Sequence, residues 1–288
     1  MKRVMITGTE TGSVIGCNLA EAFSDKYELY TPTRKQLDLT DYDAVSRYFD
    51  NNRIDIIILS AASVVNKLES DLKMFFNLEK YSRNLEKMIY FSSGAEYDKR
   101  FDLINVNEND IGKRIPVDEY GFAKYIMTEY ARRSSNIYNL RFFGIFGKYE
   151  DWTYKYISNL CCKAIFNLPL SIRRQCLFDY IYVNDLPGVV EWMIENKPDY
   201  HDYNFVSGKP FLLTEIAEMV LKISGKDLEV IMLNPEGRGL GYTASNERLK
   251  KELPWFEPTP LYEAIEELYR WYFDNSDSID FDVLRKTK

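Results

Sequence analysis

The sequence predicts an α/β protein in which a doubly wound parallel sheet is joined by a smaller C-terminal α/β domain. Short apolar runs alternate with helical stretches through the first half, which is the pattern of βαβ units with right-handed crossovers. The run 54–60 is rich in isoleucine and almost uncharged, as expected of a parallel strand covered on both faces. A glycine-rich turn follows the first of these strands.

The individual elements follow from the same alternation. In the first half we expect strands at 3–7, 28–31, 54–60, 87–92 and 136–143, with helices at 14–24 and 41–50. The second half is less regular, with helices expected at 152–168, 184–195, 213–224 and 258–273 and strands at 177–183 and 203–206. Neither a repeat nor a low-complexity linker separates the halves, so we expect a continuous interface with a cleft between them.

The composition excludes several classes of partner. Lys and Arg number 37 against 44 Asp and Glu, which gives a net charge of −7 and a pI near 5.1. No broad basic field exists to hold phosphates, so we expect no nucleic acid and no membrane as partner. No apolar run reaches the roughly 18 residues of a membrane span. Four cysteines without a CxxC pair favour a cytoplasmic protein, and the single histidine, His201, argues against a multi-histidine metal site, so no metal is expected.

The turn after the first strand carries glycines at every fourth position. Glycine lets the backbone approach a phosphate closely, and the helix that follows points its N–H groups at the anion. A strand, a glycine turn and a helix in this order indicate a dinucleotide site, although a tight turn with a packing glycine is the other interpretation. The cofactor contacts expected along this turn are Gly8, Gly12, Ser13, Val14, Ile15 and Gly16.

The end of the second strand bears on the choice of cofactor. An NAD-specific site places a carboxylate here for the adenosine ribose, whereas an arginine suits a 2′-phosphate. Residues 29–34 contain no acid, and Arg34 is followed by Lys35. The sequence therefore predicts that NADP(H) is preferred, with NAD(H) possible; otherwise Arg34 is a solvated turn residue.

Tyr120 and Lys124 stand four residues apart, which puts both on one face of a helix. A Lys ammonium close to a phenol favours the phenolate, so the tyrosine can exchange a proton with a substrate oxygen. Upstream, the strand 88–91 runs into Ser92 and Ser93, at the carboxyl end where ligands bind in parallel sheets. A surface Tyr–Lys pair and an ordinary serine turn are the alternatives at these two places.

The order of these motifs resembles the extended short-chain dehydrogenase/reductase family, the NAD(P)-dependent nucleotide-sugar epimerases, dehydratases and reductases. After the glycine turn come Ser-Ser-x-x-x-Tyr at 92–97 and Tyr-x-x-x-Lys at 120–124. Residues 140–147 are similar to the family's Leu-Arg-x-x-Asn-Val-Tyr-Gly, with Gly144 in place of Asn. Residues 178–185 are similar to Arg-Asp-Phe-Ile-Tyr-Val-Asp-Asp, and 203–208 to Tyr-Asn-Val-Gly-Ser-Gly. The glycine turn is longer than the family's GxxGxxG.

The resemblance implies roles for these residues. Tyr120 would be the catalytic acid/base, Lys124 would hold the nicotinamide ribose and tune Tyr120, and Ser93 would hydrogen-bond the reacting oxygen. Arg238 is similar to an arginine that meets the phosphates of the sugar nucleotide, with an ordinary loop cation as the alternative. Beyond the turn, Arg34 and Lys124, the cofactor-binding residues implied are Asp38, Leu39, Ala61 and Ala62.

A domain division and an assembly are also implied. A Rossmann-like dinucleotide-binding domain would span 1–147 with a returning segment at about 177–206, and the substrate domain would comprise 148–176 and 207–288. The partner would be a nucleotide-diphosphate sugar. The family also implies a homodimer through the helix of Tyr120 and the one before it.

Absent residues narrow the reaction. The family's 4,6-dehydratases carry Asp-Glu directly after the catalytic hydroxyl residue, where this chain has Gly94 and Ala95, which move no proton. Its fucose-nucleotide epimerase/reductases use a Cys and a His, but no Cys lies near Ser93 and no His precedes His201. Residues 31–41 nevertheless resemble the NADPH-binding segment of that subgroup, the type of GDP-fucose synthase.

The expected activity is therefore NADPH-dependent reduction of the C4 carbonyl of a nucleotide-linked 4-keto-6-deoxyhexose, with Tyr120 as proton donor. An NAD-dependent C4-epimerase of a nucleotide sugar, or a C4-oxidase, is the first alternative. A non-catalytic nucleotide sensor built on the same fold is the second, and intact Ser93, Tyr120 and Lys124 argue against it.

Overall fold

Strands and helices alternate through the first half of the chain. The structure, a computed structural model, describes residues 1–10, 13–63 and 67–287. Up to residue 146 its elements are β1 (Arg3–Ile6), α1 (Val14–Phe23), β2 (Glu28–Tyr30), α2 (Tyr42–Asn51), β3 (Ile56–Leu59), α3 (Lys67–Ser82), β4 (Lys87–Ser93), the short 3-10 helix η1 (Gly94–Tyr97), β5 (Leu103–Val106), η2 (Glu108–Asp110), α4 (Glu119–Ala131), β6 (Ile137–Phe142) and β7 (Gly144–Phe146).

The elements of the second half are smaller and less regular. They are α5 (Tyr156–Ile165), β8 (Leu170–Ile172), β9 (Leu177–Phe178), β10 (Tyr180–Tyr182), η3 (Val183–Asp185), α6 (Leu186–Glu195), β11 (Asp202–Phe205), β12 (Phe211–Leu212), α7 (Leu213–Ser224), β13 (Val230–Met232), β14 (Tyr242–Ala244), α8 (Glu247–Glu252), α9 (Leu261–Asp274), η4 (Ser276–Ser278) and α10 (Phe281–Leu284).

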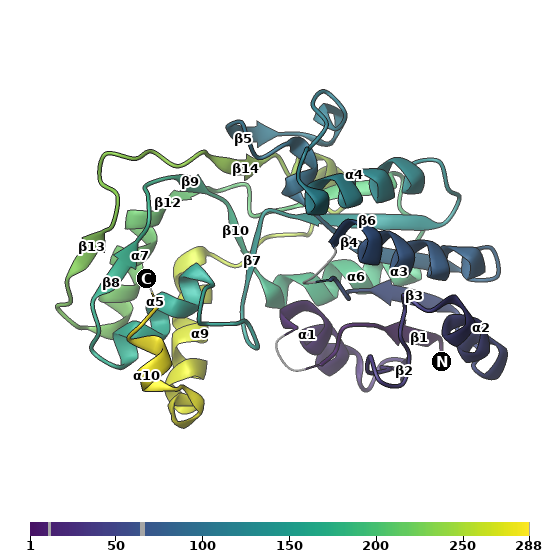
Figure 1. The fold of residues 1–288 in the computed structure, drawn as a ribbon, viewed down its shortest axis with the longest axis horizontal. Helices are drawn as coiled ribbons and strands as arrows, with labels where there is room; N and C mark the ends of the chain where they lie inside the picture. The colour runs from purple at the N-terminus through teal and green to yellow at the C-terminus, as the bar shows by residue number, and fades with distance from the viewer. Residues whose placement is uncertain (11–12, 64–66, 288) are drawn as a thin grey trace.

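The main sheet has six parallel strands in the order β11-β6-β4-β3-β1-β2. Side chains alternate between its faces, as the two-residue period of a strand requires. Val4 and Ile6 pack in one buried cluster with α1 and α6, whereas Met5 packs in another with α2, α3 and α4. Both faces are therefore covered, and the predicted Rossmann-like, doubly wound fold with a smaller C-terminal α/β part is confirmed (Figure 1).

The last strand of this sheet arrives after a long excursion. From β6 the chain crosses into the C-terminal part, builds α5 and β8 to β10, and returns through α6 to place β11 beside β6. The N-terminus lies at the sheet side of the molecule and the C-terminus at the opposite side (Figure 1). The boundaries of the two domains stay a prediction, but the sheet itself contains strands from both sides of the excursion.

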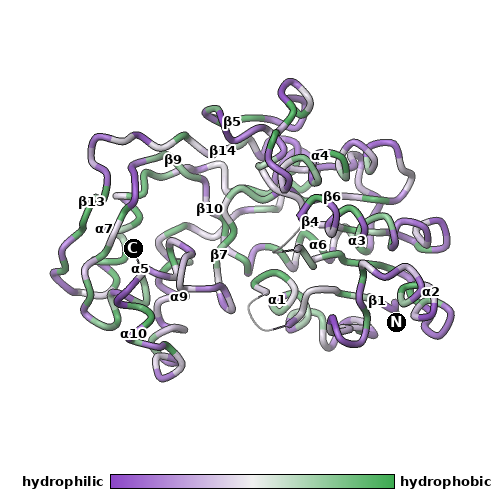
Figure 2. The backbone as a smooth tube through the Cα atoms, viewed as in Figure 1, coloured by the Kyte–Doolittle hydropathy of each residue, from purple (hydrophilic) through white to green (hydrophobic). Residues whose placement is uncertain are grey.

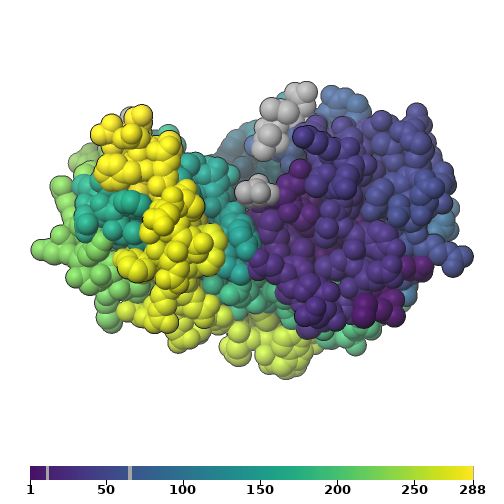
Figure 3. Space-filling model, turned by 90° about the horizontal axis from the view of Figure 1, so that it is seen from below, coloured from purple at the N-terminus to yellow at the C-terminus, as the bar shows by residue number. Residues whose placement is uncertain are grey.

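The C-terminal part has its own buried cluster, formed by α5, α7 and α9 with β8 and β10. A mixed sheet of four short strands, β12-β9-β14-β5, bridges this part and the segment after β4. The long connection between β13 and β14 runs on the outside and is mostly hydrophilic (Figure 2). Seen from another side, the surface is hollowed between the N-terminal and C-terminal parts (Figure 3).

One expected strand is followed directly by a strand of another sheet, and a second expected strand is interrupted. The run 136–143 forms β6 as expected, and β7, which begins at Gly144, pairs with β10 in a separate two-stranded sheet. The run 177–183 divides into β9 and β10 at Asp179, because the buried Asp179 carboxylate accepts hydrogen bonds from the Ser207 and Gly208 backbone N–H groups at 2.9 Å each. In both places the chain turns from one sheet to another.

Candidate active site

Two pockets adjoin at the carboxyl edge of the main sheet. One, of about 420 Å³, lies over β1, β2 and β3, and the other, of about 430 Å³, lies over β4 and reaches the C-terminal part. Ser60, Ala61 and Ala62 line both, so the pockets are neighbouring parts of one cleft. This is the edge at which ligands bind in open parallel sheets. We call them the β1–β3 pocket and the β4 pocket.

The glycine turn lies at the β1–β3 pocket, with Gly8 lining it directly. Gly8 has a φ of +67°, and a Cβ on it would lie 2.8 Å from the Ala61 nitrogen. A Cβ on Gly16 would lie only 1.9 Å from the Gly8 carbonyl oxygen. Ser13 stands immediately before α1 and lines the same pocket, whereas Val14 and Ile15 line the β4 pocket. Gly12 lies outside the described residues.

The Gly16→Ala variant tests this close packing. Its methyl group would force the turn away from α1, so we expect at least about tenfold weaker NADP(H) binding and a stability loss of about 1–3 kcal/mol. Calorimetric titration and urea unfolding measure the two effects. Gly188→Ala is the matched control, because its Cβ would meet only Trp255 at an ordinary 3.9 Å. Unchanged cofactor affinity in Gly16→Ala would contradict the assignment.

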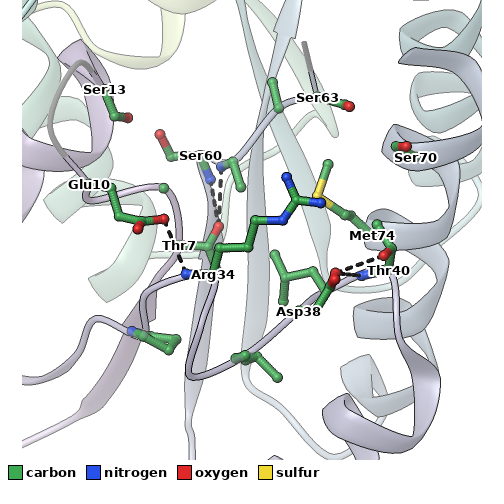
Figure 4. Close-up of a pocket in the computed structure, with 16 residues that line it drawn as sticks. Thr7, Glu10, Ser13, Arg34, Asp38, Thr40, Ser60, Ser63, Ser70 and Met74 are labelled. Atoms are coloured by element: carbon green, nitrogen blue, oxygen red, sulfur yellow. Dashed lines mark hydrogen bonds between the residues drawn. The ribbon is translucent and has the colours of Figure 1, made fainter. Parts of the chain in front are cut away.

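The Arg34 side chain extends into the β1–β3 pocket (Figure 4). Its backbone N–H donates to the Glu10 carboxylate at 3.1 Å, so the turn after β2 is tied to the glycine turn. Asp38 and Leu39 line the same pocket. Hydrogen bonds from the Thr40 hydroxyl and backbone hold the pKa of Asp38 below its usual range. The sequence analysis did not predict Glu10 as a pocket residue. The one feature that could have indicated it is its acidic side chain inside the lengthened glycine turn.

The β4 pocket brings Ser93, Tyr120 and Lys124 together. Ser93 ends β4, and both Tyr120 and Lys124 lie on α4, whose first turn is capped by Asp118 accepting from the Gly121 N–H at 3.0 Å. The Lys124 Nζ lies 5.6 Å from the centre of the Tyr120 ring. The sequence spacing thus leads to one cluster of hydroxyl, phenol and ammonium groups.

Two residues that the sequence analysis missed touch this cluster. Asp71, on α3, places Oδ2 3.4 Å from the Lys124 Nζ. Tyr242, on β14, places its hydroxyl 3.4 Å from the Ser93 Oγ. Burial raises the pKa of Tyr242, so it remains a neutral phenol at neutral pH. Both contacts join residues far apart in the chain, so no local spacing in the sequence predicts them.

Close packing around this pocket explains why glycine occupies positions 94 and 144. A Cβ on Gly94 would lie 2.7 Å from the Phe143 ring and 2.8 Å from the Tyr242 hydroxyl. A Cβ on Gly144 would lie 2.7 Å from the Phe178 ring and 2.8 Å from the Tyr180 ring, which stack at 4.6 Å. The departure from the family's Asn at this position therefore leaves room for an aromatic wall.

Glu150 is a buried carboxyl group in the β4 pocket. Burial raises its pKa to about 7, while the Lys155 ammonium, 3.7 Å away, opposes that rise. The Ser158 hydroxyl donates to Glu150 Oε2 at 2.6 Å. The pocket thus contains a second titratable pair, on the side of the C-terminal part.

Arg238 lies elsewhere. It is exposed on the connection between β13 and β14, its backbone pairs with Gln175, and it does not line either of the two pockets described. Its contact with substrate phosphates stays a prediction. Within residues 1–10, 13–63 and 67–287, no group of three or more His, Cys, Asp or Glu side chains could hold a metal ion, and no helix is long and apolar enough to cross a membrane.

Comparison with known proteins now gives the family. Residues 4–205 match the NAD dependent epimerase/dehydratase family, which is most of the chain, and the protein belongs to this family of NAD(P)-dependent enzymes. The resemblance inferred from the sequence is confirmed.

Individual relatives are distant. GDP-L-colitose synthase of Yersinia pseudotuberculosis is 20% identical over 309 aligned residues, which cover 96% of this chain and 99% of that protein. A GDP-L-fucose synthetase from Naegleria fowleri bound to NADP has a TM-score of 0.84 at 18% identity, covering 99% and 96% of the chains. UDP-glucose 4-epimerase from Thermotoga maritima with UDP-glucose has a TM-score of 0.82 at 18% identity, covering 95% and 99%. At these identities the structural likeness shows the fold.

Proposed function

We propose that the protein reduces the C4 carbonyl of a nucleotide-linked 4-keto-6-deoxyhexose with NADPH, using Tyr120 as the proton donor. The proposal rests on one observation. Ser93, Tyr120 and Lys124 line the β4 pocket, which adjoins the β1–β3 pocket that Arg34 lines. The names of the relatives support the substrate class, because GDP-L-colitose synthase and GDP-L-fucose synthetase both name a GDP-sugar.

The residues present fit a dinucleotide. The tight Gly8–Gly16 contact brings the glycine turn against α1, whose N-terminal N–H groups suit a pyrophosphate. Arg34 in the β1–β3 pocket suits a 2′-phosphate, and Asp38, Leu39, Ala61 and Ala62 line the space for the adenosine part. When bound, the nicotinamide supplies the hydride.

The chain's own groups then act on the substrate oxygen. The Ser93 hydroxyl binds the carbonyl oxygen and aligns it, and the Tyr120 phenol gives that oxygen its proton. Lys124 positions the nicotinamide ribose and the Tyr120 hydroxyl. Gly94 and Ala95 provide no acid or base, and Glu96, which follows them, is buried on Arg141 and Thr128. The site therefore lacks the two acidic residues that the family's dehydratases carry directly after the catalytic hydroxyl residue, and reduction is favoured over dehydration.

The Arg34→Ala variant tests the choice of cofactor. Charge-assisted hydrogen bonds contribute about 1.5–3 kcal/mol, so the KM for NADPH should rise by about 10–150-fold while that for NADH stays within about twofold. Steady-state kinetics with both cofactors measure this. Lys35→Ala, at the next position and outside the pocket lining, should change neither value. Equal losses with NADPH and NADH would contradict a 2′-phosphate contact.

The activity itself is tested with a panel of nucleotide-linked 4-keto-6-deoxyhexoses, following the absorbance of NADPH and then of NADH. Consumption of NADPH with formation of the 4-hydroxy product supports the proposal. Interconversion of nucleotide hexoses without net consumption of either cofactor would identify a C4-epimerase and overturn it. A homodimer through α3 and α4 stays a prediction, which sedimentation of the purified chain tests.

A further inference from the structure

We propose that Asp71 is a positioning residue that holds Lys124 and offsets its charge beside Tyr120. This inference rests on the proposed reductase function, in which Tyr120 must start as a phenol. Asp71 lies on α3, which carries none of the motif residues. Asp71 therefore joins the site from a helix that lies there because of tertiary packing and not because of a sequence motif.

The contact is a buried ion pair. The Asp71 side chain is 1% exposed and that of Lys124 is 4% exposed, with Oδ2 and Nζ 3.4 Å apart. The other carboxylate oxygen, Oδ1, accepts the Ser63 backbone N–H at 2.7 Å, which fixes the carboxylate at the end of the segment after β3. Oδ2 has no hydrogen-bond partner among the described residues, so its facing charge is the Lys124 ammonium.

The charges around Tyr120 come from several elements. Among the residues that the structure describes, three ammonium groups face its ring, those of Lys67 at 5.5 Å, Lys124 at 5.6 Å and Lys99 at 6.0 Å from the ring centre. Two carboxylates face these lysines, Asp71 on Lys124 and Asp118 on Lys99 at 3.7 Å. Further titratable groups of the site are Tyr242, whose electrostatic environment includes Tyr120, and the pocket-lining Glu150, Tyr154 and Lys155.

The carboxylates of Asp71 and Asp118 weaken the electrostatic effect of their partner lysines on Tyr120. An ammonium group alone beside a phenol favours the phenolate, but a carboxylate next to that ammonium cancels most of its field. Of the three lysines, Lys124 is the one in a fully buried pair, where solvent screens least. The pairing with Asp71 leaves Lys124 to orient groups by hydrogen bonding while part of its charge is offset.

The Asp71–Lys124 pair favours reduction of a carbonyl group over oxidation of a hydroxyl group. An enzyme that begins by oxidising a hydroxyl group needs a tyrosinate to accept the proton, whereas a reductase needs a tyrosine that still holds it. A carboxylate paired with the catalytic lysine biases the site toward the second case. Asp71 thereby favours carbonyl reduction over an oxidation-first epimerase cycle.

The Asp71→Asn variant tests the inference without a substrate. Asparagine keeps an acceptor for the Ser63 N–H and removes the charge. Nuclear magnetic resonance of protein labelled with ¹³C at tyrosine Cζ follows phenol ionisation, and Tyr120→Phe assigns the Tyr120 signal. Because the Lys124 ammonium then faces Tyr120 without an offsetting carboxylate, the Tyr120 titration midpoint should fall in Asp71→Asn.

Controls separate charge from structure. Glu69→Gln makes the same charge change two residues away, at an exposed pair with Lys73, and should move the Tyr120 midpoint by less than about 0.3 units. Asp71→Glu keeps the charge and should restore most of the original midpoint. Asp71→Ser removes the charge with less volume and replaces Asp71→Asn if that variant does not fold. An unchanged or higher midpoint in a folded, uncharged variant overturns the inference.

A kinetic readout connects the inference to the reaction. In Asp71→Asn the pH at which kcat for NADPH oxidation falls by half should move down with the NMR midpoint, while the KM for NADPH changes little. A purely structural role would lower kcat equally at every pH. If the substrate panel shows no reduction, the proposed function fails, but the NMR titration still decides the role of Asp71.

Discussion

Tyr120→Phe is expected to lower kcat for NADPH oxidation by about 10²–10⁴-fold, the usual contribution of a positioned proton donor. Phenylalanine keeps the ring that lies among three lysines and removes the hydroxyl that serves the substrate oxygen. The dissociation constant of NADPH should change by less than about threefold, because Arg34 and the glycine turn lie in the neighbouring pocket. Stopped-flow absorbance and calorimetry measure the two quantities.

Tyr125→Phe is the matched control, since it removes a hydroxyl from the same helix at a position that does not line the β4 pocket. It should retain most of the activity. If Tyr120→Phe kept the wild-type turnover, the proton donor would be another group. Tyr242, whose hydroxyl lies next to Ser93, would be the first candidate to test.

Arg141→Met should destabilise the fold by about 3–5 kcal/mol, the usual result of removing one partner of a buried charge pair. Arg141 is 0% exposed and lies on β6, between β11 and β4 of the main sheet. Its guanidinium donates to Glu96 at 2.9 Å, to the Asn204 side chain at 2.9 Å and to Asp202 at 3.1 Å. Urea unfolding measures the loss, and Arg133→Met, 81% exposed beside Glu129, should cost less than about 1 kcal/mol.

The size of this loss should depend on pH. Burial raises the pKa of Glu96 to about 7, although Arg141 opposes that rise. A carboxyl group with a raised pKa in the folded state contributes stability at low pH, which is lost as the pH rises from its unfolded value toward about 7. Below about pH 7 Glu96 is protonated in the folded state and needs Arg141 less, so Arg141→Met should lose less stability at pH 5 than at pH 8. An equal loss at both values would contradict this role of Glu96.

Residues close together in the sequence were predictable as a site. The glycine turn, the four-residue spacing of Tyr120 and Lys124, and Ser93 at a strand end each have a local pattern with a physical reason. Their gathering in two adjoining pockets follows from the parallel sheet, because its strands end at one edge. The regular first half of the fold was predictable for the same reason, since each unit repeats one strand and one helix.

Contacts made by tertiary packing were not predictable. Asp71 meets Lys124 only because α3 packs beside α4, and Tyr242 meets Ser93 only because β14 joins a sheet with β5. Gly144 looked like an isolated departure until the rings of Phe178 and Tyr180 filled the space beside it. The break at Asp179 was missed because an apolar run shows where a strand can form, but not where a buried carboxylate interrupts it.

The late arrival of β11 has a consequence for synthesis on the ribosome. The strand lies about 60 residues after β6, so at about 5–20 residues per second it emerges roughly 3–12 s later. During that interval β6 is an open edge, and Arg141 lacks the carboxylate of Asp202. The nascent chain is then most exposed to pairing with another chain, and any nascent product cut short before residue 202 keeps that open edge permanently.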